Sequence, residues 1–185
     1  MSPFITGSTQ AYLIPGDPVR NVRLPRMFNA AFARYGIDAV LVPMQVPVRD
    51  FAVFMKSAFL ARNVRGMVIA PPHKPRVVDL LDGCGLFGRV AGSVNVVRRT
   101  EGDQLEGDLF DGEGLIGALD RCNVPFRGKR VLIRGAGVSP AASRCPETRR
   151  AAGIATRMFD FGRSMLVCRV TQQVAHDDTA WEWFD

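Results

Sequence analysis

The stretch Val68–Lys74, which reads Val-Ile-Ala-Pro-Pro-His-Lys, constrains this chain more than any other. Its apolar beginning is typical of a buried β-strand. Two consecutive prolines cannot continue such a strand, because proline has no backbone N–H for the strand ladder, so they force a turn. The sequence therefore predicts a lysine, Lys74, directly after a buried strand.

Strand-like and helix-like segments alternate on both sides of this turn. Short apolar runs predict strands, and apolar residues at helical spacing predict helices. Strands alternating with helices are typical of an α/β fold with a mostly parallel sheet. We expect strands at 11–14, 38–46, 67–70 and 131–134, helices at about 25–34, 51–59, 77–81 and 111–119, and a hairpin of 93–97 with a strand near 105. Gly36 and Asp50 are expected to cap helices, and Glu101-Gly102-Asp103 to form the hairpin turn.

The region after the strand 131–134 starts as a dinucleotide-binding unit does, with a strand followed by the glycine turn Gly135-Ala136-Gly137. The glycine fingerprint stops there, because Pro140 occupies its sixth position. Pro146 would interrupt the following helix at a cost of about 3 kcal/mol or more. We therefore predict a βαβ substrate-binding domain over 1–124, followed by a truncated Rossmann-like segment over 125–185.

Composition narrows the possible functions. The net charge of +6 comes from scattered arginines and suits an anionic small molecule as well as it suits nucleic acid, and no nucleic-acid motif is present. No apolar run reaches the ~20 residues of a membrane helix, and no secretory signal is evident, so we expect a cytoplasmic protein. The four cysteines form no CxxC metal clip, so we expect free thiols and no metal site.

Several blocks of this sequence, in this order, resemble the shikimate/quinate dehydrogenase family. Individually each block is a weak signal, whereas the ordered set is specific. The blocks are Gly16-Asp17-Pro18 with Pro25 and Asn29–Phe32, then Pro72-His73-Lys74, Gly92-Ser93-Val94-Asn95, Gly107–Gly112 and Gly135-Ala136-Gly137.

The resemblance implies a two-domain oxidoreductase that reduces 3-dehydroshikimate or a related cyclic hydroxy acid reversibly with NADP or NAD. It implies that Lys74 is the acid/base, paired with Asp111, and that Asn95 contacts ring hydroxyls. It places the cofactor at Gly135, Ala136 and Gly137, and Asp160, 25 residues beyond Gly135 at the end of a strand-like run, is a further candidate cofactor residue. The expected partner is the small cyclic acid, with no nucleic acid and no membrane, and a homodimer is left open.

The sequence departs from the family where the substrate is recognised. Two serines that hold the substrate carboxylate in the family are replaced by Val22 and Leu24, and a threonine by Ala70. A site that loses such polar groups discriminates less well between polar ligands. These changes fit a less polar substrate, an anion held by an arginine instead, or a decaying enzyme. The arginines in question are Arg20, Arg23 and Arg26.

Further interpretations concern His73, the choice of cofactor, the segment 138–150 and an alternative function. His73, beside Lys74, is interpreted as a structural residue that hydrogen-bonds the turn. Asp160 favours NAD over NADP, because a carboxylate there would bond the ribose hydroxyl, whereas Arg157 and Arg163 favour the opposite. The unusual composition of 138–150 suggests a compensated reading-frame shift, and the interrupted cofactor loop makes a non-catalytic small-acid-binding remnant the alternative function.

Overall fold

The structure is a computed structural model, and it describes residues 5–125, 130–134, 154–156 and 165–170. Its contacts divide the chain into two units. The first unit contains Met1–Cys84 and Ser93–Asp108, and the second contains Gly85–Gly92 and Leu109–Asp185. The domain boundary at 124/125 that the sequence suggests stays a prediction.

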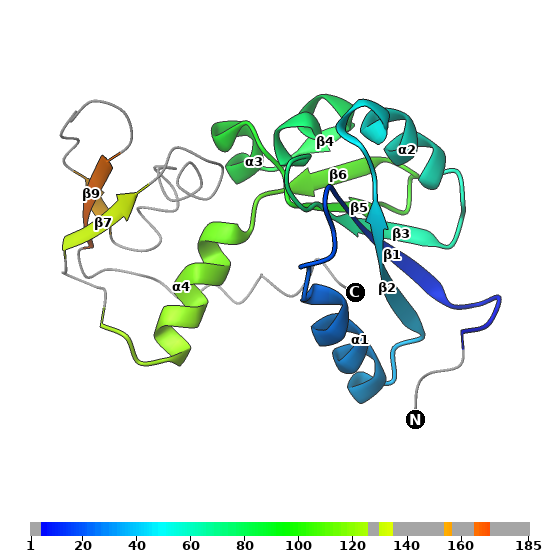
Figure 1. The fold of residues 1–185 in the computed structure, drawn as a ribbon, viewed down its shortest axis with the longest axis horizontal. Coiled ribbons are helices and arrows are strands. Elements are labelled where there is room, and N and C mark those ends of the chain that lie inside the picture. Colours follow the sequence, from blue (N-terminus) through cyan, green and yellow to red (C-terminus); the bar gives the residue numbers. More distant parts are fainter. Residues whose placement is uncertain (1–4, 126–129, 135–153, 157–164, 171–185) are drawn as a thin grey trace. The chain divides into compact units, whose positions relative to one another are not determined.

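A six-stranded mixed sheet with the strand order β2-β1-β3-β5-β6-β4 forms the centre of the first unit (Figure 1). Strand β1 pairs in parallel with β2 and β3, and β4 pairs in parallel with β6. Strand β5 is antiparallel to both of its neighbours, β3 and β6. The α/β expectation is therefore confirmed. The strands are β1 Gln10–Gly16, β2 Ala39–Gln45, β3 Val64–Val68, β4 Gly83–Cys84, β5 Val96–Arg99 and β6 Leu105–Asp108.

Two α-helices of the first unit cover opposite faces of this sheet (Figure 1). Helix α1 spans Leu24–Tyr35 and ends at Gly36, whose φ of 68° is the left-handed conformation that glycine adopts most easily. Helix α2 spans Phe51–Ala58 and follows the 3₁₀ turn η1, Val48–Asp50. Two further 3₁₀ turns, η2 (Lys74–Arg76) and η3 (Val78–Leu80), replace the single helix expected at 77–81.

The larger core lies between α2, the 3₁₀ turns and the sheet. It is built from the apolar side chains that sequence periodicity assigns to the inner faces of these elements. Its buried members are Val46, Phe51, Met55, Phe59, Val64, Met67, Ile69, Val77, Val94 and Val97. This side of the sheet supplies most of the apolar burial of the unit.

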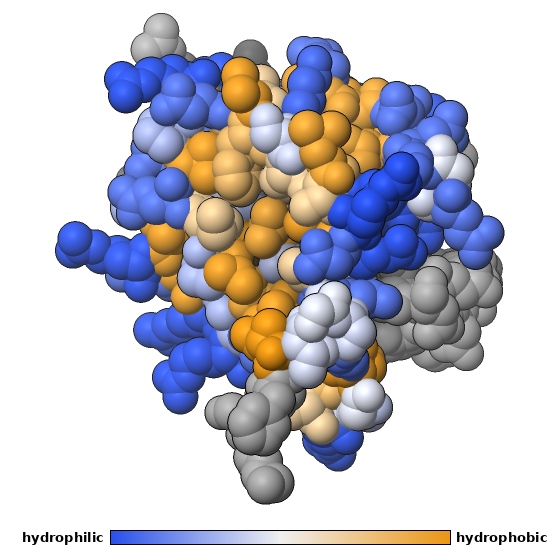
Figure 2. Space-filling model, turned by 90° about the vertical axis from the view of Figure 1, so that its right-hand side faces the viewer, coloured by the Kyte–Doolittle hydropathy of each residue, from blue (hydrophilic) through white to orange (hydrophobic). Residues whose placement is uncertain are grey.

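The core under α1 is smaller. Its buried members are Ile14, Leu41 and Ala70, and no residue of α1 itself is buried. Large apolar side chains such as Met27, Tyr35 and Ile37 stay exposed in this region of the chain. Figure 2 shows apolar side chains gathered among charged ones on the face at the right of Figure 1.

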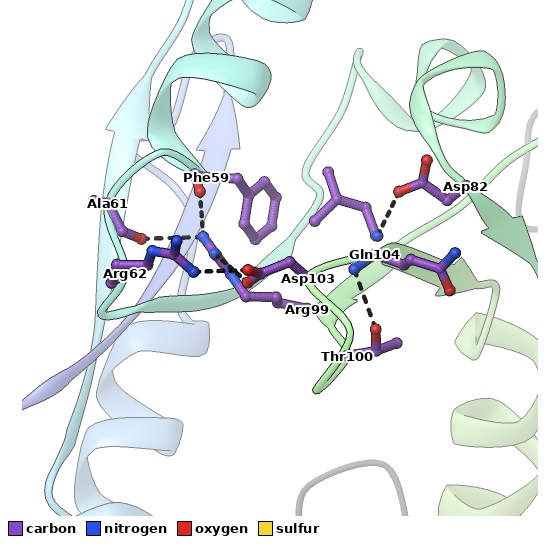
Figure 3. Close-up of polar contacts among 9 residues, drawn as sticks. Phe59, Ala61, Arg62, Asp82, Arg99, Thr100, Asp103 and Gln104 are labelled. Carbon is purple, nitrogen blue, oxygen red and sulfur yellow. Dashed lines mark hydrogen bonds and ion pairs between the residues drawn. The ribbon is translucent and has the colours of Figure 1, made fainter.

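The predicted hairpin is confirmed, with Glu101–Asp103 between β5 and β6. Arg99, at the end of β5, is almost fully buried and fastens this hairpin to the end of α2 (Figure 3). Its Nη2 donates to the carbonyls of Phe59 and Ala61, and its Nη1 donates to Asp103 at 3.0 Å. The Arg99 and Arg62 guanidinium groups lower the pKa of the Asp103 carboxyl by donating hydrogen bonds to it.

The second unit departs from the expected pattern. Its helices are α3 (Leu86–Ala91), which the sequence did not indicate, and α4 (Asp111–Arg121), which it did. Its three strands, β7 Arg130–Arg134, β8 Ile154–Thr156 and β9 Met165–Val170, form a sheet in the order β7-β9-β8. Both pairings are antiparallel, whereas a Rossmann-like segment has parallel strands.

Strands β8 and β9 lie where no strand was expected from the sequence, and β9 pairs with both other strands of this sheet. Alternating apolar residues in a short segment do not reveal which strand they will pair with. In the described parts of the chain, no helix is long and apolar enough to cross a membrane.

Candidate functional site

The turn Ala70–Lys74 follows β3 and is held by backbone hydrogen bonds to β1 and to the loop after it. The N–H of Ala70 donates to the carbonyl of Pro15 at 2.9 Å, and the N–H of Asp17 donates to the carbonyl of Pro71 at 3.1 Å. The carbonyl of Lys74 accepts from the N–H of Val94 at 3.0 Å. The half-buried Lys74 therefore begins at a backbone position fixed from two sides.

His73 anchors this turn from inside the protein. Its side chain is fully buried, and its Nε2–H donates to the carbonyl of Val46 at 2.9 Å. Because a carbonyl only accepts, this bond selects the tautomer with the proton on Nε2. Burial lowers the pKa of His73, so the ring stays neutral near pH 7. The structural role expected for His73 is confirmed, although its partner is the segment after β2 and not the turn.

Asn95 lies where β3 ends, β5 begins and β6 ends. Its carbonyl accepts from the N–H of Ile69 at 2.7 Å, and its N–H donates to the carbonyl of Asp108 at 3.1 Å. The residue is 9% exposed. Because Val94 bonds the backbone of Lys74, the structure brings Asn95 and Lys74 to the same edge of the sheet.

Asp111, the expected partner of Lys74, is the first residue of α4. It follows the end of β6 by three residues and belongs to the second unit. The pairing of Lys74 with Asp111 therefore stays a prediction. The expected cofactor residues Gly135, Ala136, Gly137 and Asp160 lie outside the described residues, and their roles stay predictions as well.

Val22, Leu24 and Ala70, the three positions that depart from the family pattern, lie together. Val22 and Leu24 are half-buried and pack against the cluster that contains the buried Ala70. The loop between β1 and α1 lies close to the turn after β3. A Cβ atom on Gly16 would come within 2.9 Å of the Ala70 Cβ, closer than two carbon atoms can approach.

Sequence reasoning missed two buried polar groups at this edge of the sheet. Ser93 is 1% exposed, and its Oγ has no hydrogen-bond partner among the described residues. Asp108, at the end of β6, is 7% exposed. Both residues stand inside blocks that carry the family resemblance, and each follows a glycine and precedes an apolar residue.

Comparisons with known proteins identify relatives of this chain. Residues 14–97 match the family described as the shikimate dehydrogenase substrate binding domain. The chain is 35% identical to shikimate dehydrogenase (NADP(+)) of Rubrobacter xylanophilus, over 76% of this chain and 49% of that protein. It is 39% identical to the Geobacter metallireducens enzyme of the same name, over 75% and 48%. The chain thus spans about half the length of the curated relatives it matches.

Solved structures give the same result for the fold. Shikimate 5-dehydrogenase from Listeria monocytogenes, in complex with shikimate and NAD, matches with a TM-score of 0.66 and 28% identity, over 77% of this chain and 48% of that one. The ligand-free 5-ketofructose reductase of Gluconobacter sp. strain CHM43 matches with a TM-score of 0.64 and 30% identity, over 73% and 48%.

Proposed function

We propose that this chain, whose residues 14–97 belong to the shikimate dehydrogenase substrate-binding domain family, binds a small polyhydroxylated ring compound and takes part in its reversible NAD(P)-dependent oxidation. The observation that carries the proposal is the placement of Lys74 and Asn95 at one edge of the sheet. The loop between β1 and α1 contacts the same turn, so three segments converge there.

Lys74 is proposed as the proton carrier. When an alcohol is oxidised to a ketone, a hydride leaves its carbon and a proton leaves its oxygen. A bound nicotinamide supplies the acceptor for that hydride and its two electrons. The Lys74 amine takes the hydroxyl proton, and its ammonium form returns a proton to the ketone oxygen in the reverse direction. Asp111 is proposed to stabilise the ammonium form of Lys74 by its negative charge.

Asn95 is proposed to orient the ring. Its amide can donate two hydrogen bonds and accept others, which suits hydroxyl groups that also do both. A ligand whose ring hydroxyls match this pattern of donors and acceptors is therefore favoured over one that lacks them.

The names of the curated relatives support NADP as the cofactor, since both carry NADP(+). One solved neighbour contains NAD, and Asp160 also favours NAD by its charge. Titration of the purified chain with NADPH and NADH, followed by nicotinamide fluorescence, separates the two. The cytoplasmic location and the homodimer considered from the sequence remain predictions.

Activity of the chain is tested by an oxidation assay with shikimate, quinate and related polyols. We expect Lys74→Ala to abolish turnover while it keeps ligand binding, because the amine acts on the proton and not on the ring as a whole. Lys56→Ala is the matched control, because Lys56 is an exposed lysine on α2. Equal activity of Lys74→Ala and the parent protein would show that Lys74 has no catalytic role.

The second candidate function is a small-molecule-binding remnant without turnover. Pro140 and Pro146 in the cofactor loop favour it, because they conflict with a nucleotide-binding helix. This alternative predicts that the ring compound binds while neither NADPH nor NADH changes fluorescence at millimolar concentration.

A further inference from the structure

We infer that the ring compound bound at this site is uncharged, a neutral polyol or its ketone, and carries no carboxylate. The inference rests on the proposed function and narrows its substrate class. It is drawn from the side chains of Val22, Leu24 and Ala70, from the backbone beside them and from the arginines in the same loop.

Val22, Leu24 and Ala70 are the three positions that differ from the family pattern. Their side chains have no hydrogen-bond donor. Val22 and Leu24 are half-buried against the apolar cluster of Ile14, Leu41 and Ala70. A carboxylate can only accept hydrogen bonds, so it needs donors wherever it leaves water. Placing an ionised carboxylate against alkyl groups without such donors costs more than leaving it in water. An uncharged substituent avoids most of this cost.

Three backbone amides beside these side chains are already engaged within the protein. The N–H of Val22 donates to the carbonyl of Val19 at 3.0 Å, and the N–H of Ala70 donates to that of Pro15 at 2.9 Å. The N–H of Asp17 donates to the carbonyl of Pro71. These amides already stabilise the loop and the turn, so they cannot also hold an anion.

The arginines of the loop do not replace the missing hydroxyls. Exposure alternates along the entry to α1, where Val22 and Leu24 are half-buried and Arg23 between them is exposed. Arg23 is thus more exposed to solvent than the two apolar side chains beside it. Arg20 and Arg26 are exposed as well. This pattern disfavours the arginine-held anion that the sequence left open.

The polar residues at the site do not require a charged ligand. An ammonium group such as that of Lys74 can donate to a hydroxyl or a ketone oxygen, and the amide of Asn95 can both donate to a hydroxyl and accept from it. The site thus keeps residue types suited to the reacting oxygen and the ring hydroxyls, while it lacks hydroxyl side chains at the positions where the family resemblance places a carboxylate.

Binding of shikimate and of its methyl ester to the purified chain tests the inference. The two probes share one ring and differ in a single negative charge. We expect the parent protein to bind the ester at least about tenfold more tightly. The double variant Val22→Ser/Leu24→Ser should bind shikimate about tenfold more tightly than the parent does, with little change for the ester. The matched control Val22→Ala/Leu24→Ala truncates the same side chains without adding hydroxyls and should show no such gain.

The outcomes distinguish failure of this inference from failure of the proposed function. Tighter binding of shikimate than of its ester by the parent overturns the inference and leaves the proposed function standing. An equal gain in the serine and alanine variants also overturns it, because cavity size and not hydrogen bonding would then decide. If neither probe binds any of the three proteins, each shown by circular dichroism to be folded, the proposed function fails and the inference with it.

Discussion

The ring of His73 stacks on the ring of Phe51, with centroids 4.3 Å apart and planes 5° apart. Phe51 is the first residue of α2 and is fully buried in the larger core. The hydrogen bond from His73 to Val46 holds the same ring from its edge. The turn that presents Lys74 is therefore attached to the core through its neighbour in sequence.

Replacing His73 by glutamine tests this attachment. The glutamine amide can still donate to the Val46 carbonyl, but it cannot stack on Phe51 as a ring does. We expect His73→Gln to lower the free energy of unfolding by about 1–3 kcal/mol, as measured by urea denaturation. His176→Gln is the comparison variant. It replaces the only other histidine of the sequence, which lies outside the described residues. An unchanged stability in His73→Gln would show that the stack contributes little.

The pH dependence of stability follows from the lowered pKa of His73. Burial is its main cause, and it holds the folded-state pKa below the ordinary value of 6.5. Above that value the residue is neutral in both states, so its full contribution to stability is present. As the pH falls below 6.5, the unfolded chain binds a proton that the folded chain does not, and stability decreases until the folded-state pKa is reached.

The measurement is the melting temperature of the parent and of both histidine variants between pH 8 and about pH 5. We expect the decline on acidification to be shallower in His73→Gln than in the parent, and His176→Gln measures what the other histidine contributes. Carboxyl groups contribute to the decline in all three proteins, so the difference between the curves isolates His73. Parallel curves for His73→Gln and the parent would contradict the assignment.

Local patterns predicted most of the first unit, because apolar spacing and turn residues act over a few positions. The left-handed Gly36 and the hairpin turn at 101–103 are examples. Strand β3 was less well predicted: it ends at Val68, although Ile69 and Ala70 continue the apolar run. The amides of Ile69 and Ala70 still bond Asn95 and Pro15, so only the regular pairing ends at Val68.

Long-range polar contacts could not be predicted in the same way. The partners of Arg99 at Phe59 and Ala61 lie about forty positions away, and nothing in the local sequence of β5 identifies them. The candidate site shows the same division. The family blocks indicated Lys74 and Asn95, whereas the packing of Val22 and Leu24 against Ala70 required the fold.

Arg99 gives a further test of stability. Arg99→Ala removes the donors of two backbone carbonyls at the end of α2 and the packing of the guanidinium on the Phe59 ring. We expect a loss of about 2–4 kcal/mol in the free energy of unfolding. Arg62→Ala is the control, because Arg62 also pairs with Asp103 but is 82% exposed, and such surface pairs contribute little. Equal losses in the two variants would contradict a special role for Arg99.

Asn29 gives another test of stability, at the edge strand β2. Its Oδ1 accepts from the N–H of Leu41 at 2.7 Å, and its Nδ2 donates to the carbonyl of the same residue at 3.1 Å. The amide thus pairs with backbone groups that a further strand would otherwise use. We expect Asn29→Ala to destabilise the protein by about 1–3 kcal/mol, and Asn21→Ala, at an exposed position, to have little effect. Light scattering should also show more aggregation of Asn29→Ala.

Gly107, in the middle of β6, tests how tightly the candidate site is packed. A Cβ atom there would lie 2.8 Å from Val94 Cγ1, 2.8 Å from the Val96 carbonyl oxygen and 2.9 Å from Leu81 Cδ1. Since the carbonyl belongs to the paired strand β5, the strand itself must shift to make room. We expect Gly107→Ala to cost about 1–3 kcal/mol of stability and, by moving the segment that carries Asn95, to weaken binding of the ring compound.

The control for Gly107→Ala is Gly114→Ala in α4, where a Cβ atom would meet nothing within 4 Å. Alanine is the better helix former, so this change should raise the free energy of unfolding by about 0.5–1 kcal/mol. Urea denaturation gives the stabilities, and calorimetric titration with the methyl ester of shikimate gives the affinities. Equal stability and equal affinity of Gly107→Ala and the parent would contradict this prediction. They would show that β5 and β6 make room for the Cβ atom without disturbing Asn95.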